Sequence, residues 1–403
     1  MKDLTHPLIR ISQFAAIKVI PGLANIALIP VLHSFMGAAG FGQFSLFLSF
    51  ALLSITVFGA IVTQPMYRFL SSDWEGLSNF NGFAFIAAGC GSVAGFLAGA
   101  FIGSKLDIAL QSGIFVAAAI LYTAMTVRLQ IENSIRTLAI LEALRVLLLF
   151  CLIVGFAQFY SEVTIIMAIT AFGLSFVFPL LVQPKRLKPS MPRWGWIKGK
   201  VRFGYLSAIW LMLAGLPMAL SKSFVSVHVS ETELGAISAN LDMYYRVFSI
   251  LNIAVAMWMF PAMSKAYDDG NYATARRKNL FGLGVYAAAG AAGGLFLLGG
   301  AYIFEPFPAP LAGGLTSLGA VLLACYMLQA MSLAHKPLEM SERLISMIGV
   351  MACALIAFVI TALTMLGLGL FAPSTAIAIS LCSAALVYFS GVWAIDENRK
   401  PRA

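Results

Sequence analysis

The sequence contains very little charge, since Asp, Glu, Lys and Arg together make up 11% of its 403 residues. Soluble proteins carry about 25% charged and about 45–50% apolar residues, whereas 60% of this chain is hydrophobic. That hydrophobic content suffices for about twelve membrane-spanning helices of about 20 residues each. The composition excludes a soluble enzyme, a nucleic-acid-binding protein and a secreted scaffold. It predicts an all-α integral membrane protein.

Cysteine and histidine are scarce and lack motif spacing. An odd number of cysteines with no C-x-x-C pair argues against disulfides and a metal site. The four histidines stand far apart and in no metal-ligand spacing. We therefore expect no metal and no cofactor. We also expect small, buried, hydrophobic side chains at the five cysteines, which all lie in apolar runs: Cys90, Cys151, Cys325, Cys353 and Cys382.

Other absences concern catalysis, energy and targeting. The chain has no G-x-x-x-x-G-K-[ST] motif, which excludes ATP-driven transport by this chain itself. It has no catalytic constellation, so we expect that it is not an enzyme. The first apolar stretch continues past twenty residues without an A-x-A-like cleavage site, which predicts a retained first helix rather than a signal peptide.

Long apolar runs are abundant, and many of them are bounded by Gly or Pro turns. Strands are excluded because the runs are too long and do not alternate between polar and apolar residues. In lipid, only helices or closed barrels satisfy the backbone. The sequence predicts twelve transmembrane helices, at residues 11–35, 41–66, 80–103, 107–127, 136–158, 161–182, 204–226, 234–262, 280–304, 310–334, 344–370 and 373–394.

The basic residues gather on one side of these spans. With the N-terminus in the cytoplasm, 21 of the 26 Lys and Arg residues lie in cytoplasmic segments. Two face outward, Lys105 and Lys222, and three lie within spans, Lys18, Arg145 and Arg246. Because cytoplasmic loops of membrane proteins are enriched in Lys and Arg, both termini are predicted to be cytoplasmic. The net charge of +9 then requires no nucleic acid.

A basic segment divides the chain almost at its midpoint. Residues 183–202 carry seven basic residues together with Trp194 and Trp196, which suits a segment lying on an anionic inner leaflet. A plain linker between two six-helix halves explains the same segment. The predicted organisation is an N-terminal six-helix lobe (1–182), a basic cytoplasmic linker (183–203) and a C-terminal six-helix lobe (204–403).

The two halves resemble each other at a shift of about 195 residues. The sequence FGQFS at 41–45 corresponds to LGAIS at 234–238, and in each half a proline and then an aspartate follow. Because six is an even number, both halves have the same orientation in the membrane. The predicted architecture is therefore two lobes related by a pseudo-two-fold axis along the membrane normal. Substrate would bind between the lobes, and one lobe would rock on the other.

Several short motifs resemble a known family. They are LP at 216–217, ELGAI at 233–237, YYR at 244–246, FPAMSK at 260–265 and ARRK at 275–278, with FGQF at 41–44 and RF at 68–69 in the first half. The chain resembles Wzx-type oligosaccharide-lipid flippases. Their superfamily, the multidrug/oligosaccharidyl-lipid/polysaccharide (MOP) exporters, also holds multidrug exporters and the lipid II flippase. One departure is that relatives often carry an acidic–basic pair where this chain has Ser221-Lys222.

Arg246 is the deepest charge in the sequence, at least eleven residues from either end of the eighth span. Ionisable groups at such depth usually face the interior of the bundle and serve a function. Asp242 lies four residues earlier on the same face, with Tyr245 beside it. One interpretation is a cavity cation that binds substrate phosphate and is held by Asp242 in the empty state. The other is a structural Asp–Arg pair.

Two further basic residues are candidates for substrate contact. Lys18 lies about eight residues into the first span, followed on one stripe by Gly22 and Asn25. It could contact substrate or extend to the cytoplasmic headgroups. Arg68, at the inner end of the second span, could meet phosphate, but an anchor of topology is the favoured interpretation.

Two features of the first half have structural interpretations. Glu142 and Arg145 stand three residues apart on the fifth span, which predicts a self-satisfied pair near the inner surface. The third span carries glycines at every fourth position, which predicts close helix packing inside the lobe, with a dimer interface as the alternative. These glycines are Gly91, Gly95, Gly99 and Gly103.

The resemblance implies a MATE-like flippase in the bacterial inner membrane. It would move a polyprenyl-pyrophosphate-linked oligosaccharide by alternating access for surface polysaccharide biosynthesis. Implied partners are the lipid bilayer, a coupling H⁺ or Na⁺ and polysaccharide assembly proteins. Interior cations suit a diphosphate in a low-dielectric space. The alternative is a cation-coupled multidrug exporter of the same fold. A glycan polymerase or ligase would need a large periplasmic loop that the sequence lacks.

Overall fold

The computed structural model describes residues 2–70, 76–103, 105–132, 134–183, 190–303, 311–340 and 343–397, and every regular element in these ranges is helical. The predicted all-α class is therefore confirmed. The elements in chain order are α1 (Lys2–Pro65), the π-helical turn η1 (Met66–Leu70), α2 (Leu77–Gly103), α3 (Leu106–Ile131), α4 (Ile135–Phe159), α5 (Ile165–Val182), α6 (Trp194–Ser226), α7 (Glu231–Asp268), α8 (Tyr272–Ile303), α9 (Gly314–Ala334), α10 (Lys336–Met340), α11 (Leu344–Leu368) and α12 (Pro373–Glu397).

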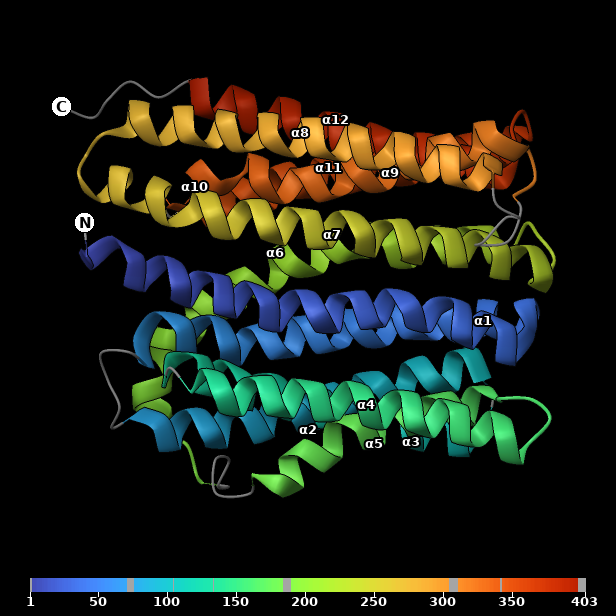
Figure 1. The fold of residues 1–403 in the computed structure, drawn as a ribbon, viewed down its shortest axis with the longest axis horizontal. Coiled ribbons are helices and arrows are strands. Elements are labelled where there is room, and N and C mark those ends of the chain that lie inside the picture. The colour runs from blue at the N-terminus through green and yellow to red at the C-terminus, as the bar shows by residue number, and fades with distance from the viewer. Residues whose placement is uncertain are drawn as a thin grey trace. The chain divides into compact units, whose positions relative to one another are not determined.

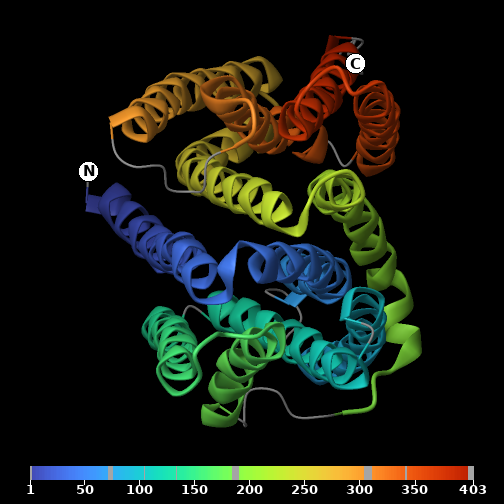
Figure 2. The same ribbon diagram turned by 90° about the vertical axis from the view of Figure 1, so that its right-hand side faces the viewer.

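Helix α1 contains two of the predicted spans. Among the described residues, eleven helices are long and apolar enough to cross a membrane, and the first of these covers 45 residues, Pro21–Pro65. The helix breaks at Gly37, whose φ of 68° favours glycine (blue part of Figure 2). The rings of His33 and Phe41 lie 5.6 Å apart across the break, whereas eight residues of straight helix span about 12 Å. The break therefore separates the predicted spans 11–35 and 41–66.

The helices form two compact units. The first unit comprises residues 31–219 and the second comprises residues 1–30 with 220–403. In Figure 1 the helices of each unit run side by side. The beginning of α1 thus belongs with the helices of the C-terminal half. The two lobes predicted from the sequence repeat, residues 1–182 and 204–403, stay a prediction.

The same packing pattern occurs in both units. In the first unit α2 packs on α3, α3 on α5 and α4 on α5. The corresponding helices of the second unit pack in the same pairs: α8 on α9, α9 on α12 and α11 on α12 (Figure 2 shows the last pair in red). This repetition agrees with the internal repeat seen in the sequence.

The glycine ladder of α2 faces α3. A Cβ atom at Gly91 would lie 2.2 Å from the Ile120 side chain, and one at Gly95 would lie 2.6 Å from Val116. Side chains larger than hydrogen are therefore excluded where the two helices meet. The predicted role in packing inside the lobe is confirmed for these positions.

The end of the basic segment is helical and attached to the first unit. Helix α6 begins at Trp194, ten residues before the predicted span. The Arg193 backbone N–H donates a 2.8 Å hydrogen bond to the Asn79 side-chain oxygen, and the Ser190 hydroxyl donates to the Ser78 carbonyl. The chain therefore enters α6 fixed to the beginning of α2.

The expectation of five buried cysteines is wrong for most of them. All five are free thiols, but only Cys325 is buried, Cys382 is half-buried, and Cys90, Cys151 and Cys353 are exposed. In a membrane-spanning protein the lipid-facing surface is as apolar as the interior. An apolar run therefore indicates a span without indicating which face of it is buried.

Candidate functional site

Helix α7 carries Asp242 and Arg246, and its beginning is encoded locally. Ser230 precedes the helix, and its hydroxyl accepts a 3.3 Å hydrogen bond from the Glu233 backbone N–H. Glu231 and Glu233 lie in the first turn, where negative charge stabilises a helix. Buried side chains then recur at intervals of three or four residues, at Leu234, Ile237, Leu241, Tyr244 and Phe248. Asp242 and Arg246 lie on a separate stripe.

Asp242 forms an ion pair with Lys222 of α6. The Lys222 Nζ atom lies 2.6 Å from Asp242 Oδ1, and the lysine side chain is 1% exposed. The sequence analysis considered only Arg246 as a partner of Asp242, and the structure adds Lys222 from the neighbouring helix. Lys222 lies inside α6, four residues before its end, and folds onto α7. A buried ammonium requires a counter-charge, and Asp242 supplies it.

Arg246 forms a hydrogen bond with α1. Its Nη1 group donates a 3.0 Å hydrogen bond to the backbone carbonyl of Asn25. The two helices approach closely because Gly22 lies against Ile250, where a Cβ atom would stand 3.0 Å from Ile250 Cδ1. The predicted stripe of Gly22 and Asn25 thus meets the stripe of Arg246. Asn25 contributes its carbonyl oxygen to this contact.

Tyr245 faces α9. Its hydroxyl is in hydrogen-bonding reach of the Gln329 side chain. Two turns further along α7, Asn252 donates hydrogen bonds to the Gln329 carbonyl and to the Ser332 hydroxyl. The buried Cys325 thiol donates to the Leu241 carbonyl at 3.7 Å. Polar contacts therefore connect α7 to α9 as well as to α1 and α6.

The remaining predicted candidates cannot be placed in this cluster. The side chains of Lys18 and Arg68 lie outside the described part of the chain. Of the six predicted site residues, the structure brings together Asn25 and Arg246 by direct contact. Asp242 lies one turn before Arg246 on α7, and Tyr245 directly precedes it. The described residues contain no group of three or more His, Cys, Asp or Glu side chains that could hold a metal ion.

Lys222 is the residue that sequence reasoning missed. The sequence analysis placed it only by topology, at the outside-facing end of a span. The useful signal was a lone basic residue within a long apolar run, since such a residue usually requires a partner inside the bundle. Among the described residues that make these contacts, Lys222 and Arg246 provide two cations and Asp242 provides one carboxylate. The cluster built from α1, α6 and α7 is therefore net positive.

The first unit contains a different charged pair. Arg145 Nε lies 3.1 Å from Glu142 Oε2, both residues are 7% exposed, and both belong to α4. The guanidinium lies over the Phe176 ring at 5.1 Å and near the Tyr122 ring at 5.9 Å. Two charges of opposite sign neutralise each other, and aromatic faces cover the cation. The predicted self-satisfied pair is confirmed.

Comparison with known proteins gives the fold. No model of a protein family matches the sequence, and no curated protein matches it significantly. Solved structures match over nearly the whole chain. An inward-facing MATE-family multidrug resistance transporter of the MOP superfamily is 14% identical, with a TM-score of 0.70 and coverage of 94% of this chain and 96% of that one.

Two other solved structures have the same architecture. The lipid II flippase MurJ, in an inward closed conformation, is 10% identical, with a TM-score of 0.70 over 96% of this chain and 87% of that one. A MOP-superfamily transporter from Pyrococcus furiosus is 18% identical, with a TM-score of 0.59 and coverage of 97% of this chain and 95% of that one. At these identities the likeness establishes the fold: this chain is a multi-pass helical protein with the architecture of MOP-superfamily transporters.

Proposed function

We propose that this protein is a flippase that moves a polyprenyl-pyrophosphate-linked oligosaccharide from the inner to the outer leaflet of the bacterial inner membrane. In this proposal the protein is a transporter and not an enzyme, and it works by alternating access without a cofactor. The product would feed surface polysaccharide biosynthesis, such as O-antigen, capsule or exopolysaccharide. Polysaccharide assembly proteins would be its partners, and H⁺ or Na⁺ would be its coupling ion.

The observation that carries the proposal is the net positive cluster of the second unit. Lys222 is neutralised by Asp242, which leaves the charge of Arg246 in excess. A diphosphate that leaves water requires compensating charge, because an unpaired ion in a low-dielectric medium costs many kcal/mol. The guanidinium group offers a planar fork of donors that suits phosphate oxygens. An anionic lipid carrier fits this arrangement better than a cationic drug.

The structural neighbours support transport of this general kind. MurJ, which has the same architecture, is a lipid II flippase. The MATE neighbours are multidrug transporters, so the fold accommodates both classes of substrate. The choice between the classes therefore depends on the charges of this chain.

Reconstitution tests the proposal directly. The purified protein is placed in liposomes that contain a fluorescent polyprenyl-pyrophosphate oligosaccharide, and a membrane-impermeant quencher reports which leaflet holds the label. We expect faster exchange between leaflets than in liposomes that contain the Arg246→Ala variant. Equal rates for wild-type protein, variant and empty liposomes would contradict the proposal.

The second candidate is a cation-coupled multidrug exporter, which the MATE neighbours favour. An exporter of cationic drugs should expel a dye such as ethidium from cells or liposomes under a proton or sodium gradient. We expect no such efflux. Efflux of ethidium together with failure to move the lipid-linked oligosaccharide would establish the exporter instead.

The proposed topology places both termini and residues 183–202 in the cytoplasm. A fusion of alkaline phosphatase to Ala403 should be inactive, whereas a fluorescent-protein fusion at the same residue should fluoresce. High phosphatase activity at Ala403 would overturn both the orientation and the count of twelve spans.

A further inference from the structure

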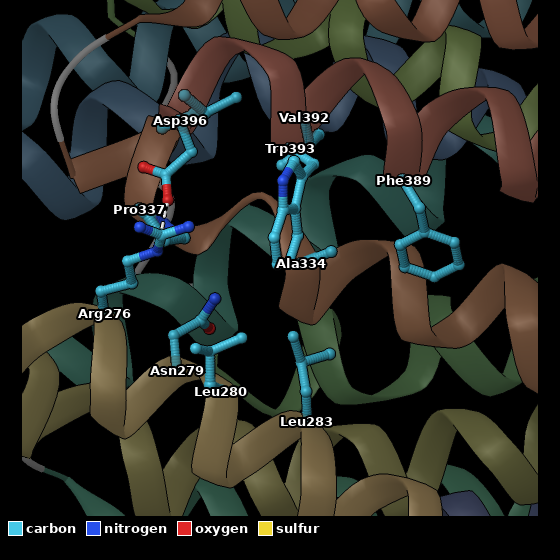
Figure 3. Close-up of a pocket in the computed structure, with 11 residues that line it drawn as sticks. Arg276, Asn279, Leu280, Leu283, Ala334, Pro337, Phe389, Val392, Trp393 and Asp396 are labelled. Atoms are coloured by element: carbon cyan, nitrogen blue, oxygen red, sulfur yellow. Dashed lines mark ion pairs between the residues drawn. The ribbon is translucent and has the colours of Figure 1, made fainter. Parts of the chain in front are cut away.

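A pocket in the second unit, separate from the cation cluster, combines a polar end with an apolar end. It has a volume of about 110 Å³ and is lined by residues from the beginning of α8, the junction of α9 and α10, and the end of α12. None of its lining residues belongs to α1, α6 or α7. In Figure 3 Arg276, Asn279 and Asp396 gather at one side, while Leu283 and Phe389 form the other.

The polar end is arranged around Arg276. Its Nε atom lies 3.1 Å from Asp396 Oδ2, and its guanidinium stands 5.6 Å from the centre of the Trp393 ring. Because Nε points to Asp396, the terminal nitrogens of the fork can donate to a second acceptor. The Arg276 side chain is 42% exposed, so a ligand can reach it.

Asn279 adds a second donor. Its side chain lines the pocket and is 4% exposed, and its amide nitrogen points toward the space beside Arg276 and Trp393 (Figure 3). Its buried Oδ1 atom has no hydrogen-bond partner among the described residues. A guanidinium and an amide N–H₂ that converge on one space form a site for a phosphate oxygen.

The other residues that line the pocket indicate which groups the ligand carries besides a phosphate. The carboxylate of Asp396 lies beside the cation, so the polar end is neutral overall and disfavours a ligand with an unbalanced negative charge. The apolar end extends from this polar end along α8 and α12, so it could hold an acyl chain attached to the bound phosphate. Trp393 is half-exposed, as is common for tryptophan at the level of lipid headgroups.

We propose that this pocket binds a zwitterionic phospholipid, phosphatidylethanolamine, from the adjacent leaflet. The phosphate would accept hydrogen bonds from Arg276 and Asn279, and the ammonium would donate to Asp396. The first part of an acyl chain would contact Leu283 and Phe389. This lipid would be a bound component of the second unit and would not be the transported substrate.

Native mass spectrometry of the full-length protein, purified in detergent and titrated with defined lipids, tests the proposal. We expect wild-type protein to bind phosphatidylethanolamine about 10- to 100-fold more tightly than phosphatidylglycerol, the size of one hydrogen bond to a charged group. Phosphatidylcholine should lie between them, because it keeps the zwitterion but lacks N–H donors. Equal binding of all three lipids, or tightest binding of phosphatidylglycerol, would overturn the proposal.

Single substitutions test the contribution of each polar residue to lipid binding. Asp396→Asn should remove the preference for phosphatidylethanolamine over phosphatidylglycerol, because it removes the charge that pairs with the ammonium. Asn279→Leu should weaken the binding of all three lipids by a similar factor. Arg276→Ala should weaken lipid binding. The matched control is Arg277→Ala, which removes an exposed cation from the next residue and should leave lipid binding unchanged. A preference that survives Asp396→Asn in folded protein would refute the assignment.

A competition experiment separates a lipid from free phosphate. Excess inorganic phosphate should leave phosphatidylethanolamine bound, because only the lipid also contacts the apolar end. Displacement of the lipid by inorganic phosphate would show that the pocket is a simple anion site. The wild-type titrations require no variant, so the proposal stays testable if a variant fails to fold.

Discussion

The two units place charged residues of the same types in different settings. In the first unit Glu142 and Arg145 neutralise each other on one helix, beneath aromatic rings. In the second unit Asp242 is paired with Lys222 from another helix, and Arg246 bonds to the backbone of a third. The first arrangement is complete within α4. The second connects three helices and keeps an excess positive charge, which is the property that a transport site for an anion needs.

The largest effect that this comparison predicts is on Arg246. Removing a desolvated charge that contacts a charged ligand costs about 2–5 kcal/mol, so Arg246→Ala should lower transport by about 30-fold or more. Arg246→Lys should keep part of the activity, because the charge remains without the forked donors. Complementation of a flippase-null strain, with protein amounts measured by blot, provides the measurement. A purely structural arginine would instead lower the amount of folded protein and leave the activity per molecule unchanged.

The next effect concerns the stability of the Lys222–Asp242 pair. Lys222→Met leaves a carboxylate without its partner, so the free energy of unfolding should fall by about 3–5 kcal/mol. The double variant Lys222→Met/Asp242→Asn should recover most of this loss, because no unpaired charge remains. Thermal unfolding of the detergent-purified protein measures both values.

The same double variant tests the importance of the excess charge. It removes one positive and one negative charge, so Arg246 still provides a net charge of one. We therefore expect transport within a few-fold of wild type in the double variant and a large loss in Lys222→Met. Loss of transport in a stable double variant would show that the pair itself acts in transport.

Two glycines provide an intermediate effect, one in each unit. At Gly95 an added Cβ would lie 2.8 Å from the Ser112 backbone oxygen, which cannot move easily, so Gly95→Ala should cost about 1–3 kcal/mol of stability. At Gly22 the nearest atom is the flexible end of Ile250, so Gly22→Ala should cost less. Because Gly22 sets the spacing of α1 and α7, it should affect transport more than Gly95 does.

Unfolding temperatures and transport rates of these two variants, normalised to folded protein, check this contrast. Ile250→Val in the Gly22→Ala background should restore transport by making room for the new methyl group. A larger loss of transport per folded molecule in Gly95→Ala than in Gly22→Ala would contradict the roles assigned to the two helix contacts.

The smallest effect is expected for the pair of the first unit. Replacing a buried ion pair by apolar or neutral groups of similar volume is often nearly neutral for stability. The double variant Glu142→Gln/Arg145→Met should change the free energy of unfolding by less than about 1 kcal/mol and should leave transport unchanged. A transport defect in this stable double variant would show that the first unit also contributes charge to transport.

The helices themselves were predictable from the sequence, because each requires only a long apolar stretch with a turn at either end. All twelve predicted spans correspond to helices, with two of them merged into α1. The Glu142–Arg145 pair was predictable for the same reason, since a spacing of three residues on one helix determines that contact. Local spacing also suggested an Asp242–Arg246 pair, but it gave no sign that Lys222 of α6 lies beside Asp242.

The sequence by itself determined the membrane-spanning helices, their repeat and the depth of Arg246. Only the tertiary structure decided the partners of the charges. The contact of Lys222 with Asp242 joins residues on α6 and α7, and that of Arg246 with Asn25 joins residues 221 positions apart. Such contacts depend on how helices pack, which apolar periodicity does not encode when lipid and protein interior are equally apolar. The exposed cysteines and the polar pocket beside Asn279 were hidden from the sequence for the same reason.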